Sequence, residues 1–238
     1  MTRAKYFIIV LALGLLAGSC EKDNYAAPNA ELYGTFIDKD TKQPVAQDIV
    51  SGTVIELIEH GWVEGQTNVT QSLVIKGDGT YRNSDIFSGK YLVRAVRGNF
   101  QNIPAIDTFD IKPGANKLDF EVTPYIRVKD PVIVKNGNIV TATFKLEQTT
   151  TQNVSRIGLY VHPNPNVGQP MKLVFAETTL NRVTTAGETF TVTLDMAAGS
   201  NTSWNTLRPG EQYYFRIGAL SSATSAKYNY APAVRLTR

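Results

Sequence analysis

The sequence has very little of the two residues that most often carry chemistry, cysteine and histidine. Its 238 residues include one cysteine, Cys20, and two histidines, His60 and His162. A single thiol cannot form an intramolecular disulfide. The chain also lacks a glycine-rich phosphate loop, a His-Glu-x-x-His motif and a nucleophile-elbow motif. We therefore expect both histidines to be ordinary surface or loop residues, and we predict no catalytic residue, no metal site and no cofactor.

The sequence also has almost no excess of charge of one sign. The 24 basic and 21 acidic residues give a formal charge of +3. Removal of an N-terminal segment that carries Arg3 and Lys5 would lower this charge to about +1, and no basic cluster remains elsewhere. Nucleic-acid binding needs a basic patch or stripe, so no nucleic-acid partner is predicted.

Only one apolar run is long, and it stands near the N-terminus. The run from Tyr6 to Leu16, "YFIIVLALGLL", follows Arg3 and Lys5 and has the length of a signal-peptide core. It is too short to span a bilayer as a helix. We therefore predict that residues 1–19 are a signal peptide.

The small residues that end this segment, Ala17, Gly18 and Ser19, directly precede Cys20. This pattern resembles the lipobox of bacterial lipoproteins, although Ala17 occupies the place where leucine is usual. In that family the signal is cut before the cysteine, whose thiol then receives diacylglycerol. The resemblance implies that Cys20 is the lipid attachment site and holds the protein on a membrane. The alternative is an ordinary secretory signal with an incidental cysteine.

Residues 20–30 contain the lipidated cysteine and a polar segment without hydrophobic periodicity, "EKDNYAAPNA". We predict a flexible tether. Its first residues, Glu21, Lys22 and Asp23, resemble the acidic signal that sends Bacteroidetes lipoproteins to the cell surface. The resemblance implies an outer-membrane lipoprotein that faces the cell exterior. The alternative is a plain solvated linker.

The remaining stretch, 31–238, has the pattern of an all-β protein. Apolar and β-branched runs of about four to nine residues recur between Gly, Pro, Asn and Asp, and no useful helical period appears. About 208 residues suit two domains of roughly 100 residues each. We predict two tandem β-sandwiches over 31–124 and 125–238, joined by a short linker at Pro124.

The first predicted domain is expected to contain a tight turn at Gly77-Asp78-Gly79, because glycine accepts positive φ and Asp bonds its own backbone. A wider pattern includes this turn and is made of Gly34, Asp38, Thr41, Pro44, Gly77, Asp78, Gly79, Tyr81, Gly89, Tyr91 and Val93. This pattern resembles the carboxypeptidase regulatory-like, or transthyretin-like, β-sandwich.

In the second predicted domain we expect a tight turn at Asn136-Gly137. A pattern near its C-terminal end is made of Leu207, Pro209, Gly210, Tyr213, Phe215, Ile217 and Ala219. This pattern resembles the fibronectin type III sandwich. Tyr213 stands where that family has a tyrosine whose hydroxyl bonds backbone across a turn.

Two acidic residues, Asp38 and Asp40, stand in the first predicted turn at a spacing that could place two oxygens on a Ca²⁺ ion. Calcium takes six to eight oxygen ligands, and "DKDTKQ" offers few others. Lys39 and Lys42 also oppose cation binding. We therefore predict a plain turn here.

Tryptophans among amides are the best candidates for a sugar site. A sugar stacks on an exposed ring while nearby polar groups bond its hydroxyls. Trp204 has Asn201 and Asn205 beside it in a predicted loop, and Trp62 stands near a strand end. We take Trp204, Asn201, Asn205 and Trp62 as candidate ligand-binding residues. The alternative is that both rings pack as core or edge residues.

The whole assembly resembles an uncharacterised family of two-domain Bacteroidetes lipoproteins encoded in polysaccharide-utilisation loci. The resemblance implies proximity to an outer-membrane transporter and its starch-binding-like lipoprotein partner. Our first hypothesis is a glycan-binding accessory protein without enzymatic activity. The second is a structural or adaptor lipoprotein that contacts a transporter complex or fimbrial assembly without binding sugar. A third, a two-carboxylate glycosidase, is disfavoured because two small sandwiches leave little room for a deep cleft.

Overall fold

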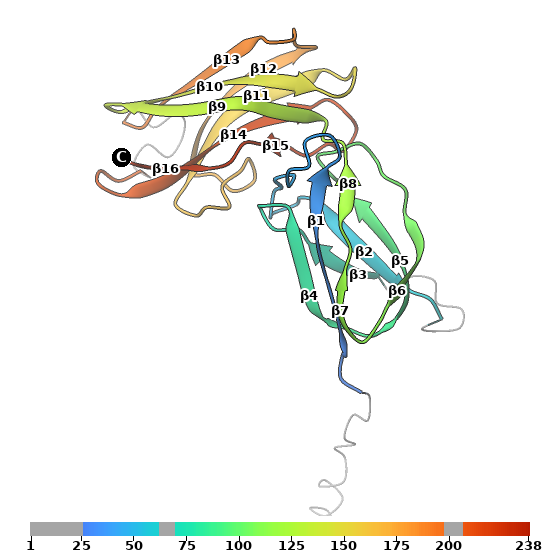
Figure 1. The fold of residues 1–238 in the computed structure, drawn as a ribbon. Coiled ribbons are helices and arrows are strands. Elements are labelled where there is room, and N and C mark those ends of the chain that lie inside the picture. The colour runs from blue at the N-terminus through green and yellow to red at the C-terminus, as the bar shows by residue number, and fades with distance from the viewer. Residues whose placement is uncertain (1–25, 62–69, 198–206) are drawn as a thin grey trace, which may run out of the picture.

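The computed structural model describes residues 26–61, 70–197 and 207–238. Within these ranges the chain is all-β and forms two β-sandwiches, as predicted, and it contains no helix long and apolar enough to cross a membrane. Figure 1 shows the two sandwiches meeting at an angle, with the start of β1 (Ala30–Asp38) at the end remote from the second sandwich. Each sandwich has its own apolar core.

The first sandwich consists of two four-stranded sheets. Its strands are β1 (Ala30–Asp38), β2 (Val54–Glu59), β3 (Thr70–Val74), β4 (Thr80–Ile86), β5 (Gly89–Val96), β6 (Ile106–Ile111), β7 (Gly114–Lys117) and β8 (Phe120–Val122). One sheet has the order β4-β1-β7, with β8 also paired to β1, and the other has the order β3-β2-β5-β6. Every second residue of β1 is buried, so the strand packs one face on the core and leaves the other partly open.

The second sandwich consists of a three-stranded and a five-stranded sheet. Its strands are β9 (Ile126–Asn136), β10 (Ile139–Gln148), β11 (Val154–His162), β12 (Val174–Arg182), β13 (Thr189–Asp195), β14 (Gln212–Ser221), β15 (Asn229–Tyr230) and β16 (Val234–Thr237). The smaller sheet has the order β13-β10-β9. The larger has the order β12-β11-β14-β15, with β16 also paired to β14.

The strands β11 and β14 are buried on both faces, unlike the alternating β10. Their inner face belongs to the core of the second sandwich. On their outer face lies a separate cluster of Tyr160, Val167, Tyr228 and Tyr230, against which Ala46 of the first sandwich packs. The first sandwich therefore adjoins the outer face of the larger sheet.

One predicted turn is confirmed and the other is displaced by a residue. Gly79 has φ of 86°, and the Asp78 carboxylate accepts the Thr80 amide at 3.0 Å, as expected for a turn there. In the second sandwich the register pairs Asn136 with Ile139, so the two central turn residues are Gly137 and Asn138 rather than Asn136 and Gly137. Gly137 has φ of 58°, a conformation that glycine accepts without a Cβ clash.

The segment that joins the sandwiches, 123–125, is fixed to the first sandwich by backbone hydrogen bonds. The Gln101 amide donates to the Thr123 carbonyl at 2.9 Å, and the Tyr125 amide donates to the Asn99 carbonyl at 3.0 Å. Pro124 forms a bridge with Phe100 between these two bonds. A linker with paired backbone restricts motion between the sandwiches.

Candidate functional site

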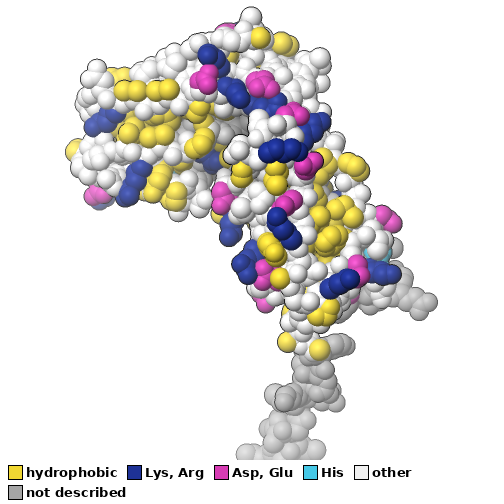
Figure 2. Space-filling model, viewed as in Figure 1, with side chains coloured by type: hydrophobic (Ala, Val, Ile, Leu, Met, Phe, Trp, Pro, Cys, Tyr) yellow, Lys and Arg dark blue, Asp and Glu magenta, His cyan; other side chains and the backbone are white. Residues whose placement is uncertain are grey.

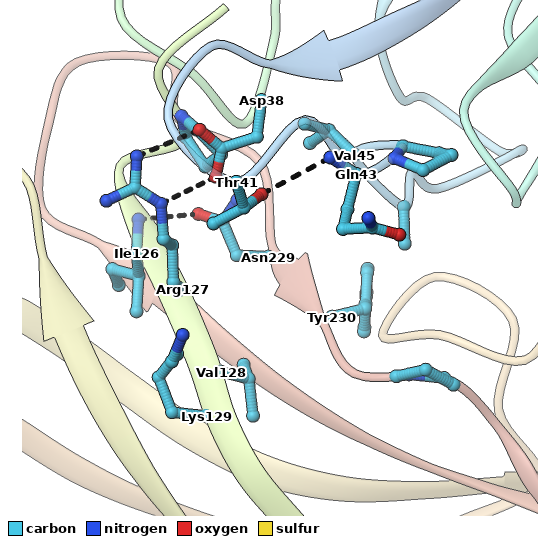
Figure 3. A pocket seen from close by; sticks show the side chains of 14 residues that line it. Asp38, Thr41, Gln43, Val45, Ile126, Arg127, Val128, Lys129, Asn229 and Tyr230 are labelled. Carbon is cyan, nitrogen blue, oxygen red and sulfur yellow. Dashed lines mark hydrogen bonds and ion pairs between the residues drawn. The ribbon is translucent and has the colours of Figure 1, made fainter.

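A hollow of about 460 Å³, which we call the first hollow, lies between the two sandwiches. One wall is the loop that follows β1, residues 41–46, and the other is the start of β9, residues 126–129 (Figure 3). Residues 229, 230 and 232 close the remaining side. The hollow therefore exists only because the two sandwiches are held together.

The lining of the first hollow combines apolar and polar side chains. Pro44, Val45 and Val128 are among the apolar residues, while Gln43 and Lys129 offer polar groups. Figure 3 shows Val128 and Lys129 on β9 across the hollow from Gln43 and Val45. Small-molecule sites commonly have this composition, with few polar groups on an apolar floor.

An ion cluster around Arg127 joins the sandwiches beside this hollow. The Arg127 guanidinium donates to both Asp38 carboxylate oxygens, at 2.5 and 2.9 Å, and to one Asp40 oxygen at 2.5 Å. It also donates to Glu147 of its own sandwich at 2.5 Å. The Arg127 side chain is only 9% exposed, so this is a largely buried, bidentate contact between the sandwiches.

The cluster changes the acid–base properties of its members. Burial alone would raise the pKa of Asp38, but the hydrogen bonds and charge of Arg127 hold it below its usual value. The bonds to Asp38 raise the pKa of Arg127 in turn. Asp38 also accepts the Asp40 amide at 3.0 Å, which is the contact of a plain turn. The prediction of a turn at this site is therefore confirmed, while the interdomain partner Arg127 was not foreseen.

A second hollow of about 560 Å³ lies next to the first, over the first half of β9, the end of β10 and the turn between β12 and β13. Lys129 lines both hollows. Asp130 and Lys145 form an ion pair of 3.0 Å on its wall. The Gln148 side chain accepts the Thr184 amide at 2.6 Å and so attaches the turn to β10.

The centre of the contact between the sandwiches is Arg216, a buried residue of β14. Its guanidinium donates to the Ala231 and Val167 carbonyls at 3.1 and 3.0 Å within its own sandwich. It also donates to two carbonyls of the first sandwich, those of Gln47 at 3.3 Å and Gly77 at 3.1 Å. Because it is 5% exposed and uses all its nitrogens, Arg216 fixes the two sandwiches in one relative position.

Two further residues surround this guanidinium. The Tyr230 ring lies against it, with 4.3 Å from the guanidinium carbon to the ring centroid. Asp48 of the first sandwich is bonded by the Tyr230 hydroxyl, and burial raises the pKa of Asp48 to about 6. A Cβ added to Gly168 would lie 2.4 Å from an Asp48 carboxylate oxygen, so only glycine permits this close approach. We call Arg216, Asp48, Tyr230 and Gly168 the seam.

Two asparagines extend the seam toward the linker. The Asn229 side chain donates to the Asn99 carbonyl at 2.8 Å and accepts the Ile126 amide at 3.2 Å. The Asn99 side chain donates to the Ala46 and Tyr228 carbonyls at 2.8 and 3.0 Å. Buried polar groups that are paired in this way favour one geometry over others. The walls of the first hollow are thus held by specific bonds.

The sequence-predicted sugar site and lipid site lie outside the described residues. This applies to Cys20, Trp62, Asn201, Trp204 and Asn205.

Residues that flank the two tryptophan segments lie at opposite ends of the molecule. The strand β2, which precedes Trp62, ends at the end of the first sandwich remote from the seam, and β13, which precedes Trp204, ends at the far end of the second (Figure 1). Neither flank lies at the first hollow.

Neither histidine forms a catalytic arrangement with other described residues. A His60 ring nitrogen lies 2.7 Å from the Asp107 carbonyl, and His162 accepts the Asn164 amide at 3.0 Å. Burial lowers the pKa of His162. Within the described ranges, no group of three or more His, Cys, Asp or Glu residues could hold a metal ion.

Sequence reasoning missed Arg127, Asp48 and Arg216. Arg216 stands in the apolar run "YYFRIGAL", and a cation within a strand buried on both faces is a signal for a paired internal contact. Arg127 stands similarly in "YIRV". No comparable local signal marks Asp48.

Fold and site together define a class: an all-β protein of two sandwiches with a fixed joint and a hollow between them. The chain belongs to the DUF3823 family. The family model described as the N-terminal domain of a protein of unknown function (DUF3823) matches residues 30–123. The model of the C-terminal domain, also described as a domain of unknown function, matches residues 126–235. Among curated proteins, none matches the chain.

Solved structures show the same fold. A candidate carbohydrate-binding protein from Bacteroides uniformis is 32% identical with a TM-score of 0.79, and the match covers 89% of this chain and all of that one. A DUF3823 protein from Parabacteroides merdae is 20% identical with a TM-score of 0.72, over 89% of this chain and all of that one. A DUF3823 protein from Bacteroides ovatus is 22% identical with a TM-score of 0.67, over 87% and 98%.

Proposed function

We propose that this protein is a non-catalytic glycan-binding accessory lipoprotein that serves polysaccharide uptake on the outer surface of the outer membrane. The observation that carries glycan binding is the relative described as a candidate carbohydrate-binding protein, because the match at 32% identity covers all of that chain. The match thus includes both sandwiches, and with them both walls of the first hollow.

The hollows support this proposal by their size and lining. Volumes of about 460 and 560 Å³ fall within the range of about 300–1,000 Å³ that is usual for small-molecule sites. Apolar side chains such as Val128 suit the C–H faces of a sugar ring, while Gln43 and Lys129 can bond hydroxyls.

The membrane anchor rests on the sequence. Cys20, at the end of an apolar run and before a polar tether, is proposed to carry the lipid. Acyl chains contribute about 0.8 kcal/mol per buried CH₂, so several chains on one residue give stable attachment. The outer-membrane transporter and its starch-binding-like lipoprotein are the proposed partners.

Retention on polysaccharides tests the binding proposal. The full-length protein, purified in detergent, is passed over immobilised plant, host and microbial polysaccharides. We expect specific retention by at least one. The variants Trp204→Ala and Trp62→Ala determine whether either predicted ring takes part. Absence of retention on every polysaccharide would exclude glycan binding as the function.

Membrane fractionation tests the anchor separately. We expect the wild-type protein in the outer-membrane fraction, labelled by a fatty acid and cleaved by protease added to intact cells. The Cys20→Ser variant should lose the fatty-acid label. A wild-type protein that takes up no label would contradict lipidation at Cys20.

A second function, that of an adaptor, is favoured by the outer face of the smaller sheet. Val132 and Val134 of β9 and Ile139 of β10 are 53%, 55% and 38% exposed, which is unusual for aligned large apolar side chains. Crosslinking from Val134→Cys in intact cells tests this role. Capture of the transporter or its lipoprotein partner would support this role. Recovery of the Val134→Cys protein without any crosslinked partner would count against it.

A further inference from the structure

The two hollows adjoin, and we call the surface that they span the track. Lys129 lines both, and Arg127 at the first hollow bonds Glu147 at the second at 2.5 Å. The register places Arg127 opposite Glu147 and Lys129 opposite Lys145, so these four side chains stand on one face of the β9–β10 pair. The hollows therefore adjoin along this face of the β9–β10 pair.

Negative charges slightly outnumber positive charges along this track. Each of these carboxylates is paired with a cation: three carboxylates bond Arg127, Asp130 bonds Lys145, and Glu121 bonds Lys42 beside the first hollow. Of the cations on the track, Lys129 alone has no ion-pair partner among the described residues. Five carboxylates stand against four cations, which leaves no excess positive charge. Figure 2 shows both signs interspersed over the visible face at the junction.

This balance disfavours anionic ligands. A chain of uronic acids or sulfated sugars would meet carboxylates already bonded to the available cations, and binding would require those pairs to break. An uncharged glycan needs only hydroxyl partners and apolar contact. Gln43, Lys129 and Thr151 offer exposed polar groups along the track, and Thr150 offers a half-buried one.

We propose that a linear, uncharged glycan binds across both hollows, with its chain passing over the Arg127–Glu147 pair. This inference rests on the proposed function and specifies its ligand class. Two adjoining hollows on one surface, open along β9, fit several consecutive sugar units of a chain rather than a single enclosed sugar. Occupation of both hollows then makes affinity depend on chain length.

Oligosaccharide ladders test the inference. Cello-, xylo- and manno-oligosaccharides of increasing length are titrated against the full-length protein, with polygalacturonate and chondroitin sulfate as anionic comparators. We expect affinity for one uncharged series to rise with length and then level off, with little dependence on salt. Preferential binding of the anionic polymers, with affinity that falls steeply as salt rises, would overturn the inference but leave glycan binding intact.

Two variants locate the chain. Ala186→Leu narrows the second hollow, and Gln43→Leu removes a polar group from the first; both residues are exposed. The matched control is Thr193→Leu, at an exposed site near the far end of β13. Ala186→Leu should weaken the affinity for long oligosaccharides at least fivefold and leave the affinity for the shortest oligosaccharide that binds unchanged. Gln43→Leu should weaken all lengths.

The outcomes separate this inference from the proposed function. Unchanged affinity in both variants, with wild-type thermal stability, places the glycan elsewhere and overturns the inference alone. Binding that does not change with chain length also overturns it. No binding of any saccharide overturns both the inference and the proposed function.

Discussion

Arg127 and Asp38, 89 positions apart in the chain, form a bidentate ion pair that joins the two sandwiches. Both side chains are more than nine-tenths buried. The pair therefore cannot be treated as a surface contact of small energy. It lies on the wall of the first hollow, so it links the relative position of the sandwiches to the shape of the proposed site.

Removal of the cation should cost considerable stability. Arg127→Met leaves the Asp38 carboxylate buried without its partner, and we expect the free energy of unfolding to fall by about 3 kcal/mol. The exposed pair of Lys42 with Glu121 gives the control, Lys42→Met, which should change it by less than about 1 kcal/mol. Chemical denaturation of the three proteins measures both. Equal losses in the two variants would contradict a special role for Arg127.

The same pair predicts a loss of stability in acid. The pKa of Asp38 is lower in the folded protein than its usual 3.8, so its contribution is present above about pH 4 and is lost as pH falls through the folded-state pKa. The difference in unfolding free energy between wild type and Arg127→Met should therefore shrink as pH falls from about 5 to 3. A difference that stays constant over this range would show that Asp38 is not held by Arg127.

Arg216 should be the residue whose loss separates the sandwiches. Arg216→Met removes the guanidinium donor from four buried carbonyl oxygens, and we expect a loss of about 3–5 kcal/mol in unfolding free energy. Calorimetry should show one transition for wild type and two for the variant, because two of the four bonds reach the first sandwich.

Two other variants keep this prediction testable. If Arg216→Met does not fold, Arg216→Lys can replace it, because lysine keeps the charge but has fewer donors. This variant should also show two transitions, closer together than those of Arg216→Met. Arg94→Met removes an exposed ion pair with Glu56 and should leave a single transition. Two transitions already in the wild-type protein would contradict coupling through the seam.

Features set by short-range patterns were predictable from the sequence. Apolar and polar residues alternate along β1 and β10, and this pattern indicates strands that bury one face. The Gly77-Asp78-Gly79 turn follows from the conformations that its residues accept. The seam was not predictable, because its bonds depend on how two separately patterned sandwiches dock. Asp48 and Arg216 have no periodic relation, and Asp38 offered no sign of Arg127.

The candidate site could be predicted even less well than the fold. Trp204 and Trp62 were selected because rings among polar residues suit sugars, and both lie outside the described residues. The first hollow draws instead on Gln43, Val128 and Lys129, which are unremarkable in sequence. Such residues gain a role only through proximity across the seam.

The environment of Asp48 leads us to predict a second dependence of folding stability on pH, opposite in sign to that of Asp38. Burial raises the pKa of Asp48 to about 6 in the folded protein, above its usual 3.8, so ionisation of Asp48 opposes folding as pH rises through this interval. A shift of this size corresponds to about 3 kcal/mol. The stability of Asp48→Asn relative to wild type should therefore rise by about this amount between pH 4 and pH 7. Denaturation of both proteins at each pH gives the difference, and a flat difference would contradict the raised pKa.

Tyr213 fulfils the contact expected from its sequence position, since its hydroxyl accepts the Arg208 amide at 2.8 Å across the turn before β14. Tyr213→Phe deletes the acceptor and leaves this amide without that partner, so we expect a loss of about 1–2 kcal/mol in unfolding free energy. Tyr125→Phe is the matched control, because the Tyr125 hydroxyl makes no hydrogen bond within the described part of the chain. Thermal and chemical denaturation compare the two. A loss in Tyr125→Phe as large as that in Tyr213→Phe would mean that removal of a hydroxyl, rather than of this bond, determines the effect.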